Sequence, residues 1–551
     1  MAEANNERVL IIGGVAGGAS AAARLRRLDE SCEIIIFDRG HFVSFANCGL
    51  PYYVGDVIKD EADLIVASPE LFKSRFDIEV RTRHEVTHID REARQIEVRA
   101  LDDGRVYTER YDKLVLSPGA RPVRPPLPGI DLPGIFVLRT IPDSREIRDW
   151  VEARGAERAV VVGAGFIGLE MAENLRRRGL QVTVLEMLDQ VMPPLDVEMA
   201  RPVEDHLREH GVELVLGDAV AGFVERDGAL EVRTQSGATI AADLVILGIG
   251  VRPETTLAEA CGLETGARGG IVVDATMRTS DPDIWAVGDA VEVPDVITGE
   301  MTCLALAGPA NREGRVAADS MCGRDTTFRG VQATSVCGVF DLVVAATGAS
   351  EKSLARACLE DYQVIYLHPG HHVGYYPGSR PIHIKLIFSR PDGRVLGVQA
   401  VGEKGVERRV DVVAMAIQMG ATVFDLEQAE LCYAPQFGAA KDPVNLAGMI
   451  AANVLRGDHP IVHWSEQRPD DVFLLDVRST SEFARGGVDG AVNIPLSQLR
   501  ARLDEIPEDR DIWVYCAVGQ RAYYATRALL QHGRRVRNLS GGIASWGVRG
   551  H

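Results

Sequence analysis

The chain has 551 residues, 46% of them hydrophobic, so it is long enough for several cores, and we expect three or four domains. Its 79 acidic and 60 basic residues give a formal net charge of −19, which argues against nucleic acid as a partner. No apolar run reaches the length of a membrane span and the N-terminus lacks a signal-peptide pattern, so we expect no membrane contact and a cytoplasmic location.

The first 38 residues predict a strand, a glycine-rich loop, a helix and a second strand. The apolar run "VLII" leads into Gly13, an alanine-rich helix follows, and "IIIF" ends in Asp38. This order is typical of a βαβ unit whose loop holds a dinucleotide pyrophosphate. Val15 replaces the middle glycine of the usual pattern, and we expect the additional Gly14 and Gly17 to supply the missing room.

Cys48 stands alone in "SFANCGLPYYVG", with no second cysteine nearby. The turn residues around it, with Pro51 just after, favour an exposed sulfur near a helix start, where backbone N–H groups lower the pKa of a thiol. A buried core thiol is the alternative. The chain's nine cysteines are scattered, which predicts neither a disulfide framework nor a metal site and fits a reducing compartment.

A second, more regular βαβ pattern covers residues 159–186. Gly163, Gly165 and Gly168 open a helix, and Glu186 closes the next strand 18 residues after the third glycine. Two such units predict two bound dinucleotides. A carboxylate at Glu186 favours the ribose diol of NADH over the 2′-phosphate of NADPH, although NADPH stays possible.

The rest of the chain divides into further segments. A strand and a Pro-rich crossing lie between the two units, and short apolar strands ending in Gly or Gly-Asp follow the second one. Residues 330–450 mix strands and helices, and 455–471 have the composition of a linker, whose mobility the sequence does not decide. The last 90 residues begin afresh with the strand "VFLLDVR".

Over roughly residues 8–450, this order resembles the two-dinucleotide flavoprotein disulfide reductases, and "AVGDA" matches their late Gly-Asp motif. The resemblance implies an α/β fold with two Rossmann-like domains for FAD and NAD(P)H, and an α+β dimerisation domain. The expected boundaries are 1–150 and 251–328 for FAD, 151–250 for NAD(P)H and 329–455 for dimerisation. The implied FAD-binding residues are Gly13, Gly14, Val15, Ala16, Gly17, Gly18, Asp38, Arg39, Asn47, Val86, Ser117, Gly119, Gly288, Asp289 and Ala307. The implied NAD-binding residues are Gly163, Gly165, Phe166, Ile167, Gly168, Glu186 and Gly250.

The single Cys48 resembles the one-cysteine branch of this family, which contains coenzyme A disulfide reductases, NADH peroxidases and NADH oxidases. One cysteine stores oxidising equivalents as a mixed disulfide, a persulfide or a sulfenic acid. Basic residues after the first loop suggest a clamp for the phosphates of coenzyme A, although they could also form a solvated face. The implied coenzyme A residues are Ser20, Arg24, Arg27, Ser44, Asn47, Lys73, Arg75, Asn311 and Lys441.

In the coenzyme A disulfide reductases, two tyrosines from the partner subunit flank the cysteine. They correspond to Tyr433 and to one of Tyr375 or Tyr376, of which we take Tyr376. The resemblance therefore implies a homodimer with a shared active site. Ordinary half-buried aromatic residues are the alternative. The helix over 19–27 has no histidine, whereas peroxidases carry one there, so a peroxidase is the weaker choice.

Residues 460–551 resemble a rhodanese domain of α/β fold. Asp476, Arg478, Glu482 and the Asn493–Pro495 segment match, whereas Gly487 stands where a histidine is usual. Cys516 directly follows an apolar strand, and a short loop leads to Arg521, so backbone N–H groups and a helix dipole should stabilise a thiolate and then a persulfide. The loop is one residue shorter than in related phosphatases, and a non-catalytic rhodanese fold is the alternative.

Together these motifs predict a flavoprotein that uses NADH to reduce coenzyme A disulfide, coenzyme A persulfide or polysulfide at Cys48 and releases thiol or hydrogen sulfide. Cys516 would handle sulfane sulfur, and coenzyme A would be a bound substrate or cofactor. Two alternatives remain: an NADH oxidase or peroxidase that cycles through Cys48 sulfenic acid, and a redox-sensing binding protein. The acceptor and the direction of sulfur flow stay open.

Overall fold

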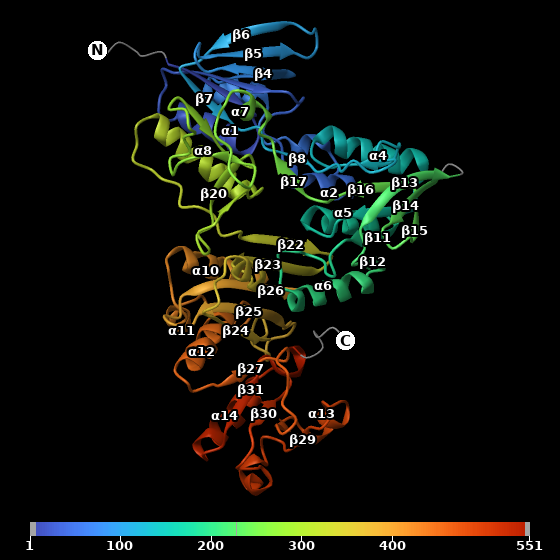
Figure 1. The fold of residues 1–551 in the computed structure, drawn as a ribbon, viewed down its shortest axis with the longest axis vertical. Helices are drawn as coiled ribbons and strands as arrows, with labels where there is room; N and C mark the ends of the chain where they lie inside the picture. Colours follow the sequence, from blue (N-terminus) through green and yellow to red (C-terminus); the bar gives the residue numbers. More distant parts are fainter. Residues whose placement is uncertain (1–6, 227–228, 546–551) are drawn as a thin grey trace. The chain divides into compact units, whose positions relative to one another are not determined.

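The computed structural model describes residues 7–226 and 229–545. The chain forms two compact units, and each has its own arrangement of elements (Figure 1). The first unit contains residues 1–189 and 211–331, and the second contains residues 190–210 and 332–551. No helix in the described part of the chain is long and apolar enough to cross a membrane.

Two parallel five-stranded sheets form the centre of the first unit, in the orders β19-β7-β1-β2-β3 and β12-β11-β10-β16-β9. Their strands consist mostly of Val, Ile and Leu because both faces are covered. The strands are β1 (Arg8–Ile12), β2 (Glu33–Asp38), β3 (Glu79–Thr82), β7 (Lys113–Leu116), β9 (Ile135–Phe136), β10 (Arg158–Val162), β11 (Gln181–Glu186), β12 (Val212–Leu216), β16 (Leu244–Leu247) and β19 (Ile284–Ala286).

Helices α1 and α8 pack side by side in this unit (Figure 1). A Cβ atom on Gly314 of α8 would lie 2.3 Å from the carbonyl oxygen of Gly17 on α1, so only glycine allows this close approach. The helices of the unit are α1 (Ala16–Arg26), α2 (Leu50–Val54), α3 (Pro69–Phe76), α4 (Ile141–Arg154), α5 (Phe166–Arg177), α7 (Thr256–Ala260) and α8 (Ala307–Met321).

Smaller sheets complete the first unit. Two three-stranded antiparallel sheets, β4-β5-β6 and β13-β14-β15, flank the parallel sheets, and short pairings connect the rest. Their strands are β4 (His84–Asp90), β5 (Gln95–Ala100), β6 (Val106–Arg110), β8 (Ala120–Pro122), β13 (Val220–Arg226), β14 (Ala229–Thr234), β15 (Thr239–Ala242), β17 (Val251–Pro253), β18 (Ile271–Val272), β20 (Val291–Pro294) and β21 (Met301–Thr302).

The second unit contains a five-stranded antiparallel sheet, in the order β22-β23-β26-β25-β24, covered by helices (Figure 1). Every residue of β26 is buried, as its central position requires. The elements are α6 (Val197–Glu209), β22 (Ser335–Val339), β23 (Leu342–Gly348), α9 (Glu351–Arg356), β24 (Tyr362–Leu367), β25 (Ile382–Ser389), β26 (Val395–Gly402), α10 (Val406–Gln418), α11 (Val423–Gln428) and α12 (Pro443–Leu455).

A parallel sheet in the order β27-β31-β30-β28-β29 ends the chain and belongs to the second unit. Its elements are β27 (Ile461–Val462), β28 (Phe473–Asp476), α13 (Thr480–Ala484), β29 (Val492–Asn493), β30 (Ile512–Tyr515), α14 (Gln520–Gln531) and β31 (Val536–Leu539). The expected α/β class is therefore confirmed. The five domain boundaries stay predictions.

The prediction of a linker at 455–471 is wrong for part of this segment. Ile461 and Val462 form an edge strand paired with β31. His459 is buried, and its Nε2 lies 2.7 Å from the side-chain nitrogen of Asn538. The chain therefore joins the last sheet within a few residues of the end of α12, which leaves little length for a mobile connection.

Candidate functional site

The two glycine-rich loops have matching geometry. Gly13 and Gly163 both have positive φ, +93° and +102°, and a Cβ on them would lie 2.1 Å from the Ser117 carbonyl oxygen and 2.5 Å from the Gly248 carbonyl oxygen. Gly18 and Gly168 close the loops, since a Cβ on either would lie 1.9 Å from the carbonyl oxygen of the first glycine. Only glycine fits these four positions.

Each loop opens a helix whose N-terminus can receive an anion. Neither α1 nor α5 has a side-chain cap or an acidic residue in its first turn. Gly165, the N-cap of α5, faces open space, so a phosphate can approach the free N–H groups there. Helix α8, which begins at Ala307, also lacks a side-chain cap and an acid in its first turn. These features fit the pyrophosphates of two dinucleotides.

An acidic side chain supports each loop from the following strand. Asp38 Oδ2 accepts a hydrogen bond from Gly14 N at 3.0 Å, and Glu186 Oε2 accepts one from Ala164 N at 2.8 Å. Burial raises the pKa of Asp38. Each carboxylate keeps lone pairs for the hydroxyl groups of a ribose.

The extra glycines of the first loop have a role in the packing of the protein itself. A Cβ on Gly14 would lie 2.4 Å from a methyl of Val43, and one on Gly17 would lie 2.8 Å from a methyl of Val287. These two glycines therefore make room for protein side chains. That they also compensate for Val15 at a bound pyrophosphate stays a prediction.

Cys48 lies in a single turn of 3₁₀ helix, Asn47–Gly49, just before α2, and its side chain is exposed as predicted. The predicted lowering of its pKa is wrong for the polypeptide. Loss of hydration raises the pKa of the Cys48 thiol, and the negative charges of Glu170 and Asp289 raise it further. The opposing effects of its own backbone N–H and of Arg139 are smaller.

Polar side chains converge around this turn. Arg139 is 3.2 Å from Asp289 through its guanidinium, and it lies 3.2 Å from the Asn47 amide. Gly288, which precedes Asp289, has a positive φ of 84° and lies 3.7 Å, measured from an added Cβ, from the hydroxyl of Ser117. The structure thus brings together Cys48, Asn47 and the Gly-Asp motif. It also joins Ser117 to the first loop, because the Ser117 hydroxyl accepts a hydrogen bond from Gly18 N at 3.0 Å.

Two buried carboxylic acids near this site escaped the sequence analysis. Burial raises the pKa of Glu170, on α5, to about 7, and the Tyr52 hydroxyl lies 3.4 Å from its Oε1. Burial also raises the pKa of Glu313, on α8, to about 7, and its Oε2 accepts a hydrogen bond from Gly288 N at 2.7 Å. Glu170 follows Gly168 by two residues, and an acid on this otherwise apolar helix start was the signal available.

Some of the residues expected to bind coenzyme A already have partners within the protein, and the others are not seen in such pairs in the described part of the chain. Ser20 on α1 donates a hydrogen bond to Asn311 on α8, which brings these two together. Arg24 is paired with Asp319 at 2.7 Å, and Lys73 is paired with Asp77, so both cations already have partners. In the described part of the chain, no ion pair is seen for the other expected residues, which are Arg27, Ser44 and Arg75 in the first unit and the exposed Lys441 in the second.

The other residues predicted to bind the two dinucleotides lie on or next to helices and strands of the first unit. Phe166 and Ile167 begin α5, Ala16 begins α1, and Arg39 directly follows β2. Val86 is a buried residue of β4. Gly119 and Gly250 both have positive φ, 74° and 96°.

Tyr433 is paired with a tyrosine other than the one chosen from the sequence. The hydroxyl groups of Tyr433 and Tyr375 are 2.9 Å apart, and both side chains are exposed. Tyr376 instead packs its ring against His372, with ring centroids 5.4 Å apart. The geometry therefore favours Tyr375 as the partner of Tyr433.

Cys516 directly follows the buried strand β30, and α14 begins four residues later, as predicted. Gly519, with φ of 90°, turns the loop, and Asn538 donates a hydrogen bond to its carbonyl oxygen at 3.1 Å. The Cys516 and Ala517 carbonyl oxygens accept hydrogen bonds from Ile543 N and Ala544 N at 2.8 and 2.9 Å. These hydrogen bonds hold the backbone of the loop that follows Cys516.

Arg521 closes this loop through a double ion pair. Its guanidinium donates to both oxygens of Glu482 at 2.7 Å, and this pairing holds the pKa of Glu482 well below its ordinary value. The same bonds raise the pKa of Arg521, and Cys516 contributes to that rise, so the cation lies near the sulfur. At Gly487, where a histidine is usual, a Cβ would lie 2.4 Å from the ring of Phe483, so a side chain there would require this ring to move.

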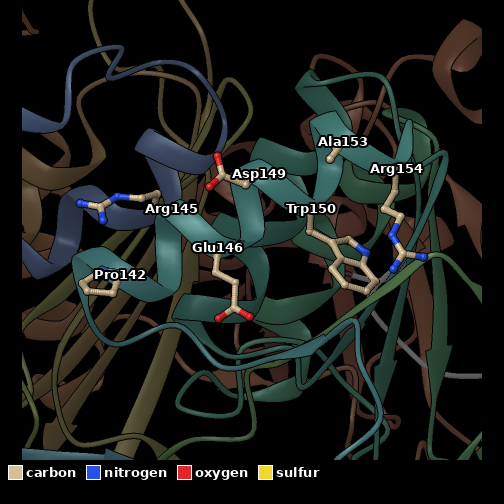
Figure 2. A pocket seen from close by; sticks show the side chains of 7 residues that line it. All are labelled: Pro142, Arg145, Glu146, Asp149, Trp150, Ala153 and Arg154. Atoms are coloured by element: carbon tan, nitrogen blue, oxygen red, sulfur yellow. The ribbon is translucent and has the colours of Figure 1, made fainter.

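A hollow of about 360 Å³ lies elsewhere, along α4 (Figure 2). All of its lining residues belong to that helix, and Glu146 and Trp150 project from one side of it (Figure 2). None of the residues predicted for a site lines it. It is a surface groove on one helix.

Comparisons with known proteins agree with this geometry. The family model "Pyridine nucleotide-disulphide oxidoreductase" matches residues 7–313, its dimerisation domain matches 334–442, and a rhodanese-like domain matches 462–548. The crystal structure of reduced Bacillus anthracis CoADR-RHD is 45% identical with a TM-score of 0.96, and the alignment covers 99% of this chain and 98% of that one.

Two further proteins extend the similarity. A NAD-dependent persulfide reductase from A. fulgidus is 38% identical with a TM-score of 0.92, covering 98% of this chain and all of that one. A coenzyme A disulfide reductase from Staphylococcus haemolyticus is 33% identical over 448 residues, which is 81% of this chain and all of that protein. Membership of this family implies FAD and NAD(H), which fit the two glycine loops. The chain belongs to the pyridine nucleotide-disulphide oxidoreductases and carries their dimerisation domain and a C-terminal rhodanese-like domain.

Proposed function

We propose that this protein is an NADH-dependent reductase of coenzyme A disulfide, coenzyme A persulfide or polysulfide that uses Cys48 as its thiol. The observation that carries the proposal is the exposed Cys48 close to Asp289 of the Gly288–Asp289 motif, in a chain that also has Cys516 directly after a buried strand of its rhodanese-type domain. FAD, when bound, supplies the transfer of two electrons from NADH.

Cys48 attacks sulfur as a thiolate. With coenzyme A disulfide, a bond forms between Cys48 Sγ and one substrate sulfur, the S–S bond breaks, and coenzyme A thiolate leaves. With coenzyme A persulfide, attack on the sulfur attached to coenzyme A releases hydrosulfide. In both cases a mixed disulfide between Cys48 and coenzyme A remains, and two electrons and a proton return it to the Cys48 thiolate and free coenzyme A.

The groups around Cys48 control its proton. Partial loss of hydration and the charges of Glu170 and Asp289 keep the pKa of Cys48 high, so the thiol form is retained until a positive charge or a change in these acids favours the thiolate. Glu170 and Glu313, whose pKa values are both raised to about 7, can change protonation near neutral pH. We therefore assign them to proton control and Arg139 to the stabilisation of negative charge.

Coenzyme A would be held as substrate by the basic residues of α1 and α3 and by the Ser20–Asn311 pair. Arg24 would contribute while it keeps its bond to Asp319. In a homodimer with a shared active site, Tyr433 and Tyr375 of one subunit would flank Cys48 of the other. Glu186 would bind the ribose diol of NADH, and its charge would repel a 2′-phosphate.

Cys516 would accept sulfane sulfur, as a persulfide stabilised by the loop N–H groups and by Arg521, and relay it toward reduction. Polysulfide is the donor that would need this relay most, because it carries no coenzyme A part for the first site to recognise.

Steady-state NADH oxidation tests the proposal, with coenzyme A disulfide, coenzyme A persulfide, polysulfide, oxygen and peroxide compared on the same holoenzyme. We expect the sulfur acceptors to exceed oxygen and peroxide. Faster turnover of oxygen or peroxide would instead identify an oxidase or peroxidase that cycles through Cys48 sulfenic acid. Negligible turnover of every acceptor would identify a redox-sensing binding protein.

A further inference from the structure

Two histidines and an aspartate meet on the second unit, outside all the residues discussed above. His206 and His210 lie one turn apart at the end of α6, and Asp341 lies in the two-residue turn of the β22–β23 hairpin. One ligand atom from each lies within 4.8 Å of the others. Asp341 Oδ1 is 2.8 Å from His206 Nε2 and 3.9 Å from His210 Nε2.

The ring of His210 is held in the form that can bind a metal. Its Nδ1 lies 2.9 Å from the carbonyl oxygen of His206. Because a carbonyl can only accept, Nδ1 must carry the proton, and the lone pair is on Nε2, which faces Asp341. Phe340 stacks on this ring, with centroids 4.2 Å apart and planes within 11°, which fixes its orientation. A histidine that binds a metal through one ring nitrogen usually donates the N–H of its other ring nitrogen to a carbonyl or a carboxylate.

His206 presents a buried nitrogen to the same point. Its Nε2 is buried and, in the described part of the chain, makes no contact with hydrogen-bond geometry, although Asp341 Oδ1 is only 2.8 Å away. A buried nitrogen without a hydrogen bond is costly, and a cation between the nitrogen and the carboxylate would remove that cost. Among the ion pairs of residues 7–226 and 229–545, Asp341 pairs with these two histidines and with no Lys or Arg.

The contrast with a nearby acidic group supports a metal ion here. Asp196, Glu198 and Glu351 also converge in the second unit, but the buried Lys385 ammonium lies among them, 2.7 Å from Asp196 and 2.5 Å from Glu351. That group is neutralised by the protein itself. The histidine group combines two neutral nitrogen donors with one carboxylate, the donor set that zinc and similar borderline ions prefer.

We propose that His206, His210 and Asp341 bind one divalent transition-metal ion of the zinc class, with water completing the coordination. Tetrahedral ligands at about 2.1 Å from zinc lie roughly 3.4 Å from one another, and the two measured separations fall on either side of that value. The ion would join the end of α6 to the β22–β23 hairpin and stabilise the second unit as a structural clip.

The test uses chelator-treated holoenzyme, dialysed to equilibrium against Zn²⁺ and analysed for bound metal. Cysteine thiolates also take up zinc, so the comparison is between variants: His210→Gln and Asp341→Asn against the wild type, with the exposed His532→Gln as the matched control. We expect the first two to bind about one zinc ion fewer per chain and the control to bind as much as the wild type.

A second measurement is the melting temperature of the holoenzyme with and without Zn²⁺. We expect zinc to raise the melting temperature of the wild type and of His532→Gln. The melting temperatures of His210→Gln and Asp341→Asn should not change with zinc. FAD content and NADH oxidation should match the wild type in all three variants, which establishes that the variants are folded. The proposal would be overturned if either the His210→Gln variant or the Asp341→Asn variant bound as much zinc per chain as the wild type.

Discussion

At the scale of single residues, the exposed thiol of Cys48 has surroundings that oppose its ionisation. Loss of hydration, Glu170 and Asp289 all raise the pKa of Cys48. The sequence predicts the exposure of Cys48 from the turn residues around it. It cannot predict the two acids, because Glu170 and Asp289 lie more than a hundred residues away along the chain and approach Cys48 only in the fold.

Replacing Glu170 with Gln should lower the pKa of Cys48, because one of the negative charges that oppose the thiolate is removed. Since the pKa of Glu170 is raised to about 7, the difference from the wild type should appear above pH 7 and disappear well below it, where Glu170 is already neutral. The rate of alkylation of Cys48 against pH, followed by peptide mass analysis, measures this. Glu146→Gln, at an exposed position of α4, is the control, and an unchanged profile in Glu170→Gln would contradict the account.

At the scale of elements, the rhodanese-type loop is held by the pair between α13 and α14. Glu482 binds Arg521 through two hydrogen bonds of 2.7 Å. We expect Glu482→Gln to reduce transfer of sulfane sulfur from thiosulfate to cyanide by about tenfold, the equivalent of one charge-assisted hydrogen bond. Glu505→Gln breaks a comparable carboxylate–guanidinium pair with Arg502 on the surface and should leave the rate unchanged. Equal rates in the two variants would show that the Glu482 pair does not position the loop.

The charge group around Lys385 stabilises the antiparallel sheet. Lys385 is fully buried on β25, and three carboxylates surround it. Lys385→Met would leave these charges uncompensated, and we expect it to lower the local free energy of opening by about 3–5 kcal/mol. Amide hydrogen exchange of β25 measures the loss, and Lys404→Met, at an exposed position, should change it by less than about 0.5 kcal/mol. Wild-type protection in Lys385→Met would refute the role of this group.

Elements with strong local patterns were predictable, and elements fixed by distant contacts were not. The two βαβ units follow from glycine spacing and apolar strands, and the structure has them at Arg8–Asp38 and Arg158–Glu186. The edge strand β27 is only two residues long, so its composition gave no strand signal, and pairing with β31 determines it. Asp196 bonds to Gln399 and Lys385, about two hundred positions away, and no local pattern encodes this contact.

At the scale of the whole molecule, the chain combines a reductase with a second cysteine in its last sheet. That sheet is tied to the rest of the second unit by several contacts. Ser540 accepts a hydrogen bond from Tyr366 N at 3.0 Å, His368 Nε2 lies 2.8 Å from the hydroxyl of Ser545, and Asn453 donates to the Tyr523 hydroxyl at 3.3 Å. The sequence predicts a linker here but does not decide whether it is mobile, and these contacts, together with the short connection after α12, favour a docked position of the last sheet.

Either Tyr375 or Tyr376 could act together with Tyr433. Tyr375 and Tyr376 are neighbours with identical side chains, so no sequence argument separates them. The hydroxyl contact of 2.9 Å between Tyr375 and Tyr433 does separate them. Tyr375→Phe should therefore weaken turnover of coenzyme A disulfide more than Tyr376→Phe, measured as kcat/KM, and the reverse order would favour the original choice of Tyr376.

The central claim is that Cys48 reduces the substrate and Cys516 only delivers sulfur to it. Sulfide release from coenzyme A persulfide, measured with NADH in the wild type, Cys48→Ser and Cys516→Ser, tests this claim most directly, with polysulfide as the second substrate. We predict that Cys48→Ser abolishes release from both substrates, whereas Cys516→Ser retains release from coenzyme A persulfide and slows it from polysulfide. Full activity of Cys48→Ser with coenzyme A persulfide would contradict the account.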